Sequence, residues 1–210
     1  MSYAADSLLI NESIEMNVIY RAARKEDSYR IAELDYIASG GASEYLFHDL
    51  VPDSTPIQVV AYGLENDFYP HSFRSAIVAE SNDEVIGMAL SFPAKFHGIN
   101  DEMRNFLPFE RLEHFKAFFS ARVDDSYYID AICVDSEYRN KGIGKSLLEK
   151  TIEKARKEGF SLLSLIAFAD NHKAIKFYND HGFVALRQVE LKEHALIPHT
   201  GGCLLMRAET

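Results

Sequence analysis

Residues 127–168 constrain the fold of this chain more than any other part of it. Tyr127 to Val134 has the aromatic and β-branched side chains of a strand, and residues 142–158 repeat apolar side chains at helical spacing until Gly159 ends the helix. Residues 161–168 are a nearly continuous apolar run, which is typical of a buried strand. A strand, a helix and a second buried strand in this order predict a sheet that is covered by helices.

Weaker signals extend this pattern over most of the chain. Further strands are expected at residues 18–21, 75–80, 85–92, 183–191 and 203–207, and further helices at residues 25–38, 56–64 and 171–181. Thr55 before Pro56, and Asn171 before the last helix, are typical N-cap residues. The polar residues 81–84 indicate a hairpin turn. We therefore expect an α+β fold in which a mixed, mostly antiparallel sheet of about six or seven strands is covered by helices.

Residues 94–126 differ from the rest and are expected to be an insertion between the third and fourth strands. Pro108 can begin a short helix here, and its apolar side chains are Phe109, Leu112, Phe115, Phe118 and Phe119. The segment could pack on the core of the chain, cap a site or form the surface of a homodimer. We accordingly divide the chain into a polar leader, residues 1–17, and one domain, residues 18–210.

The composition disfavours several classes of partner. The chain of 210 residues carries 22 Lys and Arg against 32 Asp and Glu, a net charge of -10, which disfavours nucleic acid and anionic membranes. No long apolar run occurs, and the N-terminus lacks the features of a signal peptide. Cys133 and Cys203 lie inside apolar runs and are expected to be buried thiols. We expect a soluble, cytoplasmic protein with no membrane partner.

The turn that follows the strand at residues 127–134 carries the clearest chemical signal. Its sequence is Arg139-Asn140-Lys141-Gly142-Ile143-Gly144, followed by Lys145 at the start of a helix. The first amides of a helix have no intrahelical acceptor and carry partial positive charge, and glycine lets the backbone approach an anion closely. The pattern suits a phosphate group, although a glycine turn between a strand and a helix can also be purely structural.

Two other phosphate-binding motifs do not match this turn. Gly144-Lys145-Ser146 resembles the end of a Walker A loop, but that loop needs glycine five residues before Gly144, where this chain has Arg139. A dinucleotide-binding fingerprint needs the run G-x-G-x-x-G, and the turn contains a single G-x-G. The nucleotide-triphosphatase and dinucleotide-binding interpretations therefore fail on spacing.

The same residues resemble a known family. Arg139 to Gly144 matches the R/Q-x-x-G-x-G/A signature of the GNAT superfamily of acetyl-CoA-dependent N-acyltransferases. Asn171 and the run from Tyr178 to Phe183 are similar to that family's later CoA-contacting segment. The resemblance is specific from about Ile129 to Phe183 and generic from Val18 to Phe92. It implies a GNAT-like fold and acetyl-CoA as the cosubstrate.

The resemblance also implies which residues contact acetyl-CoA. The backbone amides of residues 139–144 would hold the diphosphate, and the Arg139 and Lys141 side chains would add charge. The pantetheine arm would lie along the strand edge at residues 132–134, in a gap between this strand and the next, and a backbone N–H near Ile132 would polarise the thioester carbonyl. The residues implied to contact the cosubstrate are Ile132, Cys133, Val134, Arg139, Asn140, Lys141, Gly142, Ile143, Gly144, Lys145, Asn171 and Tyr178.

Tyr178 is the expected general acid and Asp130 the expected base. A phenol with a pKa of about 10 that protonates a thiolate with a pKa of about 8.5 faces an uphill step of only about 2 kcal/mol. An amine with a pKa of about 10.4 must first lose a proton, and Asp130 would share a face with Ile132 and Val134 at period two. Weaker candidates for the base are Glu80, Glu44 and Asp49. The alternatives are that Tyr178 is a core aromatic and Asp130 a structural strand residue.

The histidines and serines add no further catalytic motif. The eight His residues show no metal-ligand spacing with Cys or carboxylates, so no metal is expected. No G-x-S-x-G motif occurs, which favours direct transfer over a covalent enzyme intermediate. The glutamate that the family carries on the next strand is absent, because Ile166 and Phe168 occupy the comparable positions.

The expected function is therefore an N-acetyltransferase that moves the acetyl group of acetyl-CoA to a primary amine. The acceptor is expected to be a small molecule or a peptide, bound by residues 39–56 and 94–126. The acidic residues Glu44, Asp49 and Asp53 hint at a cation. A CoA-responsive regulatory module without catalysis is the alternative.

Overall fold

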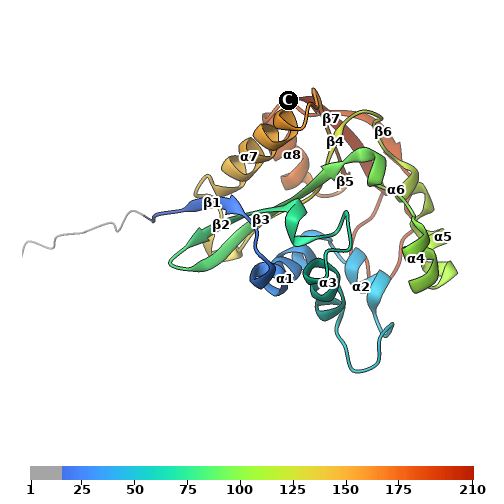
Figure 1. The fold of residues 1–210 in the computed structure, drawn as a ribbon. Helices are drawn as coiled ribbons and strands as arrows, with labels where there is room; N and C mark the ends of the chain where they lie inside the picture. The colour runs from blue at the N-terminus through green and yellow to red at the C-terminus, as the bar shows by residue number, and fades with distance from the viewer. Residues whose placement is uncertain (1–15) are drawn as a thin grey trace, which may run out of the picture.

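A seven-stranded sheet in the order β1-β2-β3-β4-β5-β7-β6 runs through residues 16–210, the part of the chain that this computed structural model describes (Figure 1). Its strands are β1 (Ile19–Ala22), β2 (Ala76–Ser81), β3 (Glu84–Pro93), β4 (Tyr127–Val134), β5 (Leu162–Phe168), β6 (Val184–Val189) and β7 (Cys203–Glu209). Every neighbouring pair is antiparallel except β4 and β5, which are parallel. The expected fold class is confirmed. Of the expected leader, residues 1–15 lie outside the described residues.

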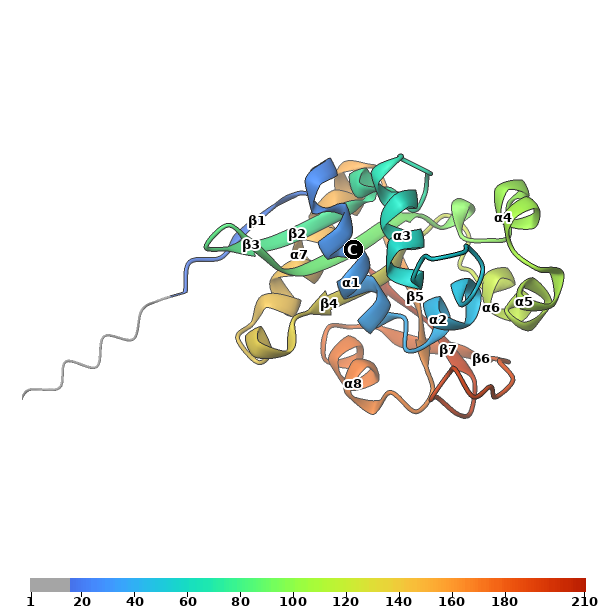
Figure 2. The same ribbon diagram turned by 90° about the horizontal axis from the view of Figure 1, so that it is seen from below.

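Helices cover both faces of this sheet (Figure 2). They are α1 (Ser28–Ala38), α2 (Ala42–Phe47), α3 (Pro56–Glu65), α4 (Asp101–Phe106), α5 (Phe109–His114), α6 (Lys116–Ser120), α7 (Ile143–Lys157) and α8 (His172–Asp180). α1 and α3 pack together on one face, with α1 over β3 and β4, and α7 packs against β2, β3 and β4 on the other face. Within residues 16–210, no helix combines the length and the apolar character that crossing a membrane requires.

Capping side chains fix where two of the helices begin. The Thr55 hydroxyl accepts from the Gln58 N–H at 3.3 Å, and the Gln58 side chain accepts from the Thr55 N–H at 2.8 Å, so α3 begins with a capping box ahead of Pro56. Asn171 Oδ1 accepts from the Ala174 N–H at 3.1 Å and caps α8. Both N-cap predictions are confirmed.

Helix α2 is not among the predicted elements. Gly40 and Gly41 both have positive φ, at 54° and 94°, and Gly41 is the N-cap of α2. The glycine pair therefore follows the end of α1 and starts a new helix. Because α2 spans only six residues, it does not repeat its apolar spacing often enough to be recognised from the sequence.

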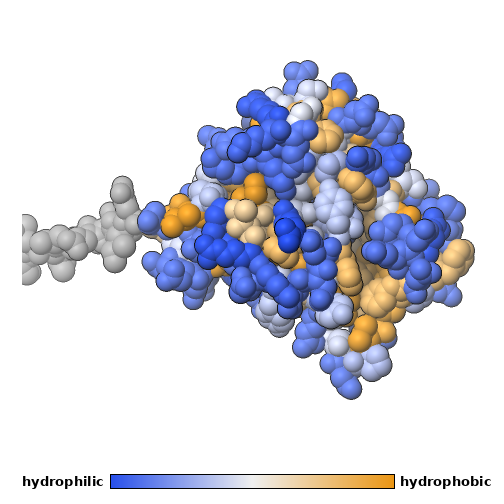
Figure 3. All heavy atoms as spheres, in the orientation of Figure 1, coloured by the Kyte–Doolittle hydropathy of each residue, from blue (hydrophilic) through white to orange (hydrophobic). Residues whose placement is uncertain are grey.

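Residues 94–126 contain three short helices between β3 and β4, and the helix predicted from Pro108 is interrupted at Phe115. Apolar residues gather along the boundary between this segment and the rest of the molecule (Figure 3). The buried members of the cluster there are Leu46, Leu107, Leu112, Phe115, Ala121, Val189, Leu191, Ile197, Cys203 and Leu205. The segment therefore packs on the chain's own core. Phe109 remains 72% exposed, and the homodimer stays a prediction.

A β-bulge interrupts β4 at Asp130. Leu90 of β3 lies opposite Ala131 and Ser91 lies opposite Ile129, so Asp130 has no opposite residue in β3. Ile129 and Ile132 consequently both face α7, although they are three residues apart, while Ala131 faces α1. The expectation that Asp130 shares a face with Ile132 at period two is therefore wrong, because the bulge shifts the alternation by one residue.

Gly202 allows a close approach between the start of β7 and the end of β6. It has a φ of 72°, and an added Cβ would lie 2.6 Å from the Val189 carbonyl oxygen. Gly159 has a similar φ of 87°, but its Cβ would meet nothing within 4 Å.

Gly159→Ala should therefore cost about 1–2 kcal/mol of stability for the left-handed backbone. Gly202→Ala should cost about 1–3 kcal/mol more because of steric overlap. Urea denaturation measures both losses, and equal values would contradict the close approach.

Candidate active site

Strands β4 and β5 separate halfway along their length. Their pairing runs from Tyr127 opposite Leu163 to Ile129 opposite Leu165 and then ends. Beyond this point β4 stays paired with β3 up to Val134, and β5 stays paired with β7. Beyond this point, the facing edges of β4 and β5 in the middle of the sheet do not hydrogen-bond to each other.

The hydrogen-bond alternation identifies the groups on the open edge of β4. The Asp135 N–H donates to the Ile86 carbonyl at 2.9 Å, and opposite residues in an antiparallel ladder alternate between bonded and non-bonded pairs. Cys133 therefore bonds to β3, while the N–H and C=O groups of Ile132 and Val134 point away from β3. Of the three residues expected along this edge, Ile132 and Val134 present backbone groups to it and Cys133 does not. The Cys133 thiol is buried on the α1 face, where burial raises its pKa to about 11.

The same alternation applies to β5. The Ala169 N–H donates to the Gly202 carbonyl at 2.9 Å, which places the odd-numbered residues of β5 in the ladder with β7. The backbone groups of Ile166 and Phe168 then point toward β4. The Phe168 carbonyl already accepts from the Asn171 N–H at 3.0 Å, so the groups of β5 that stay open are the N–H groups of Ile166 and Phe168 and the Ile166 carbonyl.

The glycine turn leads from the end of β4 into α7. Asn140 and Gly142 have positive φ, 62° and 81°, and Gly142 is the N-cap of α7. Ser146 is the first residue whose N–H bonds back to this turn, at 3.1 Å from the Gly142 carbonyl. Among residues 16–210, no backbone or side-chain oxygen accepts from the amides of residues 140–145. A Cβ on Gly142 would meet nothing within 4 Å, so there is open space beside the residue that starts α7.

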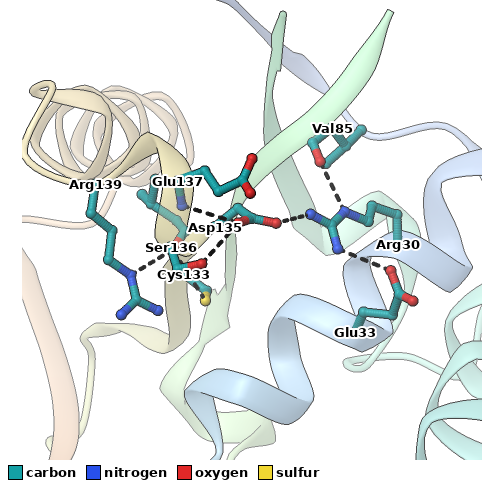
Figure 4. Close-up of polar contacts among 9 residues, drawn as sticks. Arg30, Glu33, Val85, Cys133, Asp135, Ser136, Glu137 and Arg139 are labelled. Atoms are coloured by element: carbon teal, nitrogen blue, oxygen red, sulfur yellow. Dashed lines mark hydrogen bonds and ion pairs between the residues drawn. The ribbon is translucent and has the colours of Figure 1, made fainter.

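Ion pairs and hydrogen bonds hold this turn in place (Figure 4). Arg139 Nε donates to the Val134 carbonyl at 3.0 Å, which ties the turn to the end of β4. Asp135 pairs with Arg30 of α1 and accepts from the Glu137 N–H at 3.3 Å. Arg30 also donates to the Val85 carbonyl of β3 at 3.0 Å. The turn is therefore positioned by β4 and, through Arg30, by the helix on the opposite face.

Tyr178 lies on α8 and packs between Phe177 and Phe183, with ring centroids 5.3 Å from each. Burial raises its pKa above the usual value for a phenol. Its hydroxyl has no hydrogen-bond partner among the described residues. The pKa of buried Tyr128 on β4 is raised by burial, then by Asp130, and to a smaller extent by Tyr178, so these three side chains lie within electrostatic reach of one another.

A cluster of ionisable side chains faces the bulge from the α1 side. His71 Nε2 lies 3.5 Å from Asp130 Oδ2, and Asp35 of α1 adjoins this pair. Burial, and secondly the neighbouring Asp130 carboxylate, raise the pKa of Asp35 to about 7, while His71 and Ser43 oppose the shift. The His71 side chain is half-exposed; partial desolvation lowers its pKa, but Asp130 and Asp35 outweigh this effect and the net shift of the pKa is upward.

The sequence indicates Asp130 as a candidate base, but the prediction does not include its neighbours Asp35 and His71. Asp35 follows Ile31 by four residues and therefore lies on the buried face of α1. A carboxylate on the apolar stripe of a helix is a signal that the sequence does contain. No comparable signal marks His71, because only the fold brings its loop beside β4.

The weaker candidates for the base each have another partner. Glu80 pairs with Arg21, and Glu44 accepts from the Tyr36 hydroxyl at 2.7 Å. Asp49 is 84% exposed and pairs with His48 at 3.0 Å. Across residues 16–210, no group of three or more His, Cys, Asp or Glu side chains is arranged to hold a metal ion.

Comparisons with known proteins place this arrangement in a family. The model of the acetyltransferase (GNAT) family matches residues 43–183, which is more than half of the chain. A crystal structure of an acetyltransferase is 27% identical, with a TM-score of 0.66, covering 91% of this chain and 98% of that one. An N-acetyltransferase from Staphylococcus aureus Mu50, 23% identical with a TM-score of 0.64, shares the fold over 91% of this chain and 100% of its own. The chain belongs to the GNAT family of acetyltransferases.

The curated relatives match over a shorter stretch. An uncharacterised N-acetyltransferase of Methanocaldococcus jannaschii is 42% identical over 55 residues, which is 26% of this chain and 24% of that protein. N-alpha-acetyltransferase 30 of Saccharomyces cerevisiae is 32% identical over 62 residues, 30% of this chain and 35% of that protein. The matched stretches therefore span about a quarter to a third of these relatives.

The Asp35→Asn variant should be more stable than the unsubstituted chain, and this difference in the free energy of unfolding should grow as the pH rises. The pKa of Asp35 is about 7 in the folded protein against an ordinary value of 3.8, so its contribution to stability is full below pH 3.8 and is lost as the pH rises through 7. Asparagine has no such loss, so the variant should gain about 1–4 kcal/mol over the unsubstituted chain by about pH 8. Urea denaturation at several pH values measures the difference. Asp83→Asn on the exposed hairpin turn is the control, and a pH-independent effect of Asp35→Asn would contradict the burial of this charge.

Proposed function

We propose that the chain transfers the acetyl group of acetyl-CoA to a primary amine. The observation that carries the proposal is the separation of β4 and β5 directly beside the unpaired amides at the start of α7. Open strand edges suit the amide groups of pantetheine, and free helix-terminal amides suit a diphosphate. Both features occur in one continuous site of a chain that belongs to an acetyltransferase family.

The diphosphate would bind at the turn from Arg139 to Lys145. Its negative charge would meet the free amides of residues 140–145 and the positive end of the α7 dipole. Lys141 is exposed, with its Nζ atom 5.2 Å from the Tyr138 ring centroid, and can add charge at the rim. A neighbour of similar fold, the PaiA N-acetyltransferase of Thermoplasma acidophilum, was solved in complex with coenzyme A.

The pantetheine arm would lie between the open edges of β4 and β5. Ile132 and Val134 on one side, and Ile166 and Phe168 on the other, would supply backbone N–H donors. The Val134 carbonyl already accepts from Arg139 Nε and the Phe168 carbonyl from the Asn171 N–H, so the carbonyls of Ile132 and Ile166 would be the main acceptors. The Ile132 N–H would polarise the thioester carbonyl, because it points into the gap and has no partner in β3. Asn171 can contribute its side-chain Nδ2 group, since its Oδ1 already caps α8.

Tyr178 would supply the proton to the departing thiolate. Burial disfavours a phenolate, but the same environment disfavours a thiolate, so the difference between the two acids decides whether the transfer is feasible. The lack of a hydrogen-bond partner leaves the hydroxyl free to donate. Asp130 would act on the opposite, α1 side as the base for the acceptor amine.

The acceptor would be a small molecule or a peptide that carries a primary amine. Structural neighbours include the ribosomal-protein-S18-alanine N-acetyltransferase of Escherichia coli, with a TM-score of 0.55, and a NatC complex bound to a Gag peptide and CoA, with a TM-score of 0.52. The names of both neighbours indicate protein or peptide substrates. Thiol release from acetyl-CoA with a panel of amines and peptides tests the proposal, because release must depend on the amine. A CoA-responsive regulatory module would bind CoA without such release.

Tyr178→Phe should lower kcat by about 10²-fold with saturating substrates, because the thiolate then leaves without a proton donor. CoA affinity should stay close to that of the unsubstituted chain, since the ring and its packing are kept. Tyr29→Phe removes a hydroxyl from a tyrosine that is 53% exposed on α1 and serves as the control. Unchanged turnover in Tyr178→Phe would remove the assigned role.

Gly142→Glu should abolish CoA binding without unfolding the chain. The new side chain would place bulk and negative charge beside the free amides, where the diphosphate is proposed to bind. Gly159→Glu is a matched control, because Gly159 also has a positive φ and open space around it but lies at the other end of α7. Isothermal titration calorimetry with CoA measures both variants. Intact affinity in Gly142→Glu would refute the phosphate site.

A further inference from the structure

Three ionisable side chains from separate parts of the chain meet on the α1 side of the strand gap. Asp130 is the bulged residue of β4, directly after the last residue paired with β5. His71 approaches it from the loop before β2, at 3.5 Å. Asp35 approaches from α1, one turn after Ile31, which packs with Ala131 and Cys133 of β4. It lies within electrostatic reach of Asp130 and His71. The proposed function uses only one of these groups, Asp130.

We infer that Asp35 is the group that takes the proton of the acceptor, and that the acceptor enters as an ammonium ion between Asp35 and Asp130. The inference rests on the proposed function and names a proton acceptor and a substrate class for the same site. It gives Asp35 the role of base that the proposed function gives to Asp130, and it assigns Asp130 and His71 to binding and positioning the cation. The acceptor class is accordingly a primary amine that is protonated in solution.

The partners of the two carboxylates favour this division of roles. Asp130 has His71 beside it, whereas no Lys, Arg or His nitrogen among residues 16–210 lies within ion-pair distance of Asp35. A carboxylate without a cationic partner gains most from neutralisation, because protonation removes both its desolvation cost and its repulsion from Asp130. When an ammonium ion binds, its positive charge pairs with the Asp35 carboxylate. When it reacts, it gives a proton to that carboxylate.

The ionisation of Asp35 suits this task. Burial, and secondly the charge of Asp130, raise its pKa to about 7, which brings the carboxylate close to the pH at which a base works best. The groups that face it are Asp130 and the Cys133 thiol from β4, His71 from the loop before β2 and Ser43 from α2. An ordinary carboxylate would hold the proton far less well.

The transfer step balances with the residues at hand. The ammonium nitrogen gives one proton to Asp35, and its freed electron pair forms the C–N bond to the acetyl carbon. The C–S bond breaks, and the sulfur takes the proton of Tyr178. The second proton of the nitrogen restores Tyr178, and Asp35 releases its proton to water. The net products are the acetylated amine, the free thiol and one proton.

Asp35→Asn tests the inference because it keeps the size and shape of the side chain while removing the base. We expect kcat/KM for the amine to fall by about 10²- to 10⁴-fold, with the Kd for CoA unchanged by calorimetry. Asp83→Asn, on the exposed hairpin turn, should keep the activity. Normal kcat/KM in Asp35→Asn would overturn the inference and leave the proposed function standing.

The pH profile separates Asp35 from the amine's own ionisation. With the unsubstituted chain, log kcat/KM should rise through an apparent pKa of about 7 for both a peptide α-amine and an alkylamine, and this limb should be absent in Asp35→Asn. A limb that instead moves with the pKa of the amine would overturn the role of Asp35. Failure of every amine to release thiol from the unsubstituted chain would overturn the proposed function, and the inference with it.

Titration of the Asp35 carboxyl by ¹³C NMR gives a readout that does not depend on activity. The signal is assigned as the one missing in Asp35→Asn, and His71→Ala should move its titration to higher pH, because the positive charge that opposes protonation is lost. A titration that does not respond to His71→Ala would show that the three groups do not act as one cluster.

Discussion

The early end of the pairing between β4 and β5 is the constraint on which the site depends. A strand in the middle of a sheet normally satisfies its backbone groups on both sides, and leaving them unpaired in the interior is costly. Here the pairing stops after Ile129 and Leu165, and the bulge at Asp130 follows at once. A bulge bends its strand and increases the local twist, so it accounts for the direction in which β4 leaves its neighbour. A ligand with its own amide groups can restore the missing hydrogen bonds.

The bulge also distributes the chemistry between the two faces of the sheet. Without it, Asp130 and Ile132 would point to the same side, and the carboxylate would compete with the α7 face for space. With it, Asp130 turns toward Asp35 of α1, while Ile132 packs toward α7. Tyr178 of α8 packs against the same apolar cluster as Ile132. The proposed base and the proposed acid therefore approach one gap from different helices, which suits a reaction in which a nucleophile adds at one side and a thiolate leaves at the other.

The parts of this molecule that the sequence predicts are those that short-range physics determines. Gly142 and the residues around it specify a strand, a turn and a helix start through φ angles and capping, and these appear as expected. Asn171 and Thr55 cap helices for the same reason. The bulge at Asp130 is set by the register with β3, which depends on residues forty positions away, so a rule of simple alternation misplaces its neighbours.

Asp35 shows how a local inconsistency can point to function. Its position on the inner stripe of α1 would suit an apolar side chain, and an ionised carboxylate there is destabilising because burial and Asp130 both oppose its charge. Packing alone gives no reason for aspartate at this position, and neither does an ion pair. The positions where a sequence conflicts with its own fold are those where another requirement decides the residue. In this chain that position adjoins the bulge, the strand gap and His71, so the requirement is most simply the binding and deprotonation of a cation at the gap.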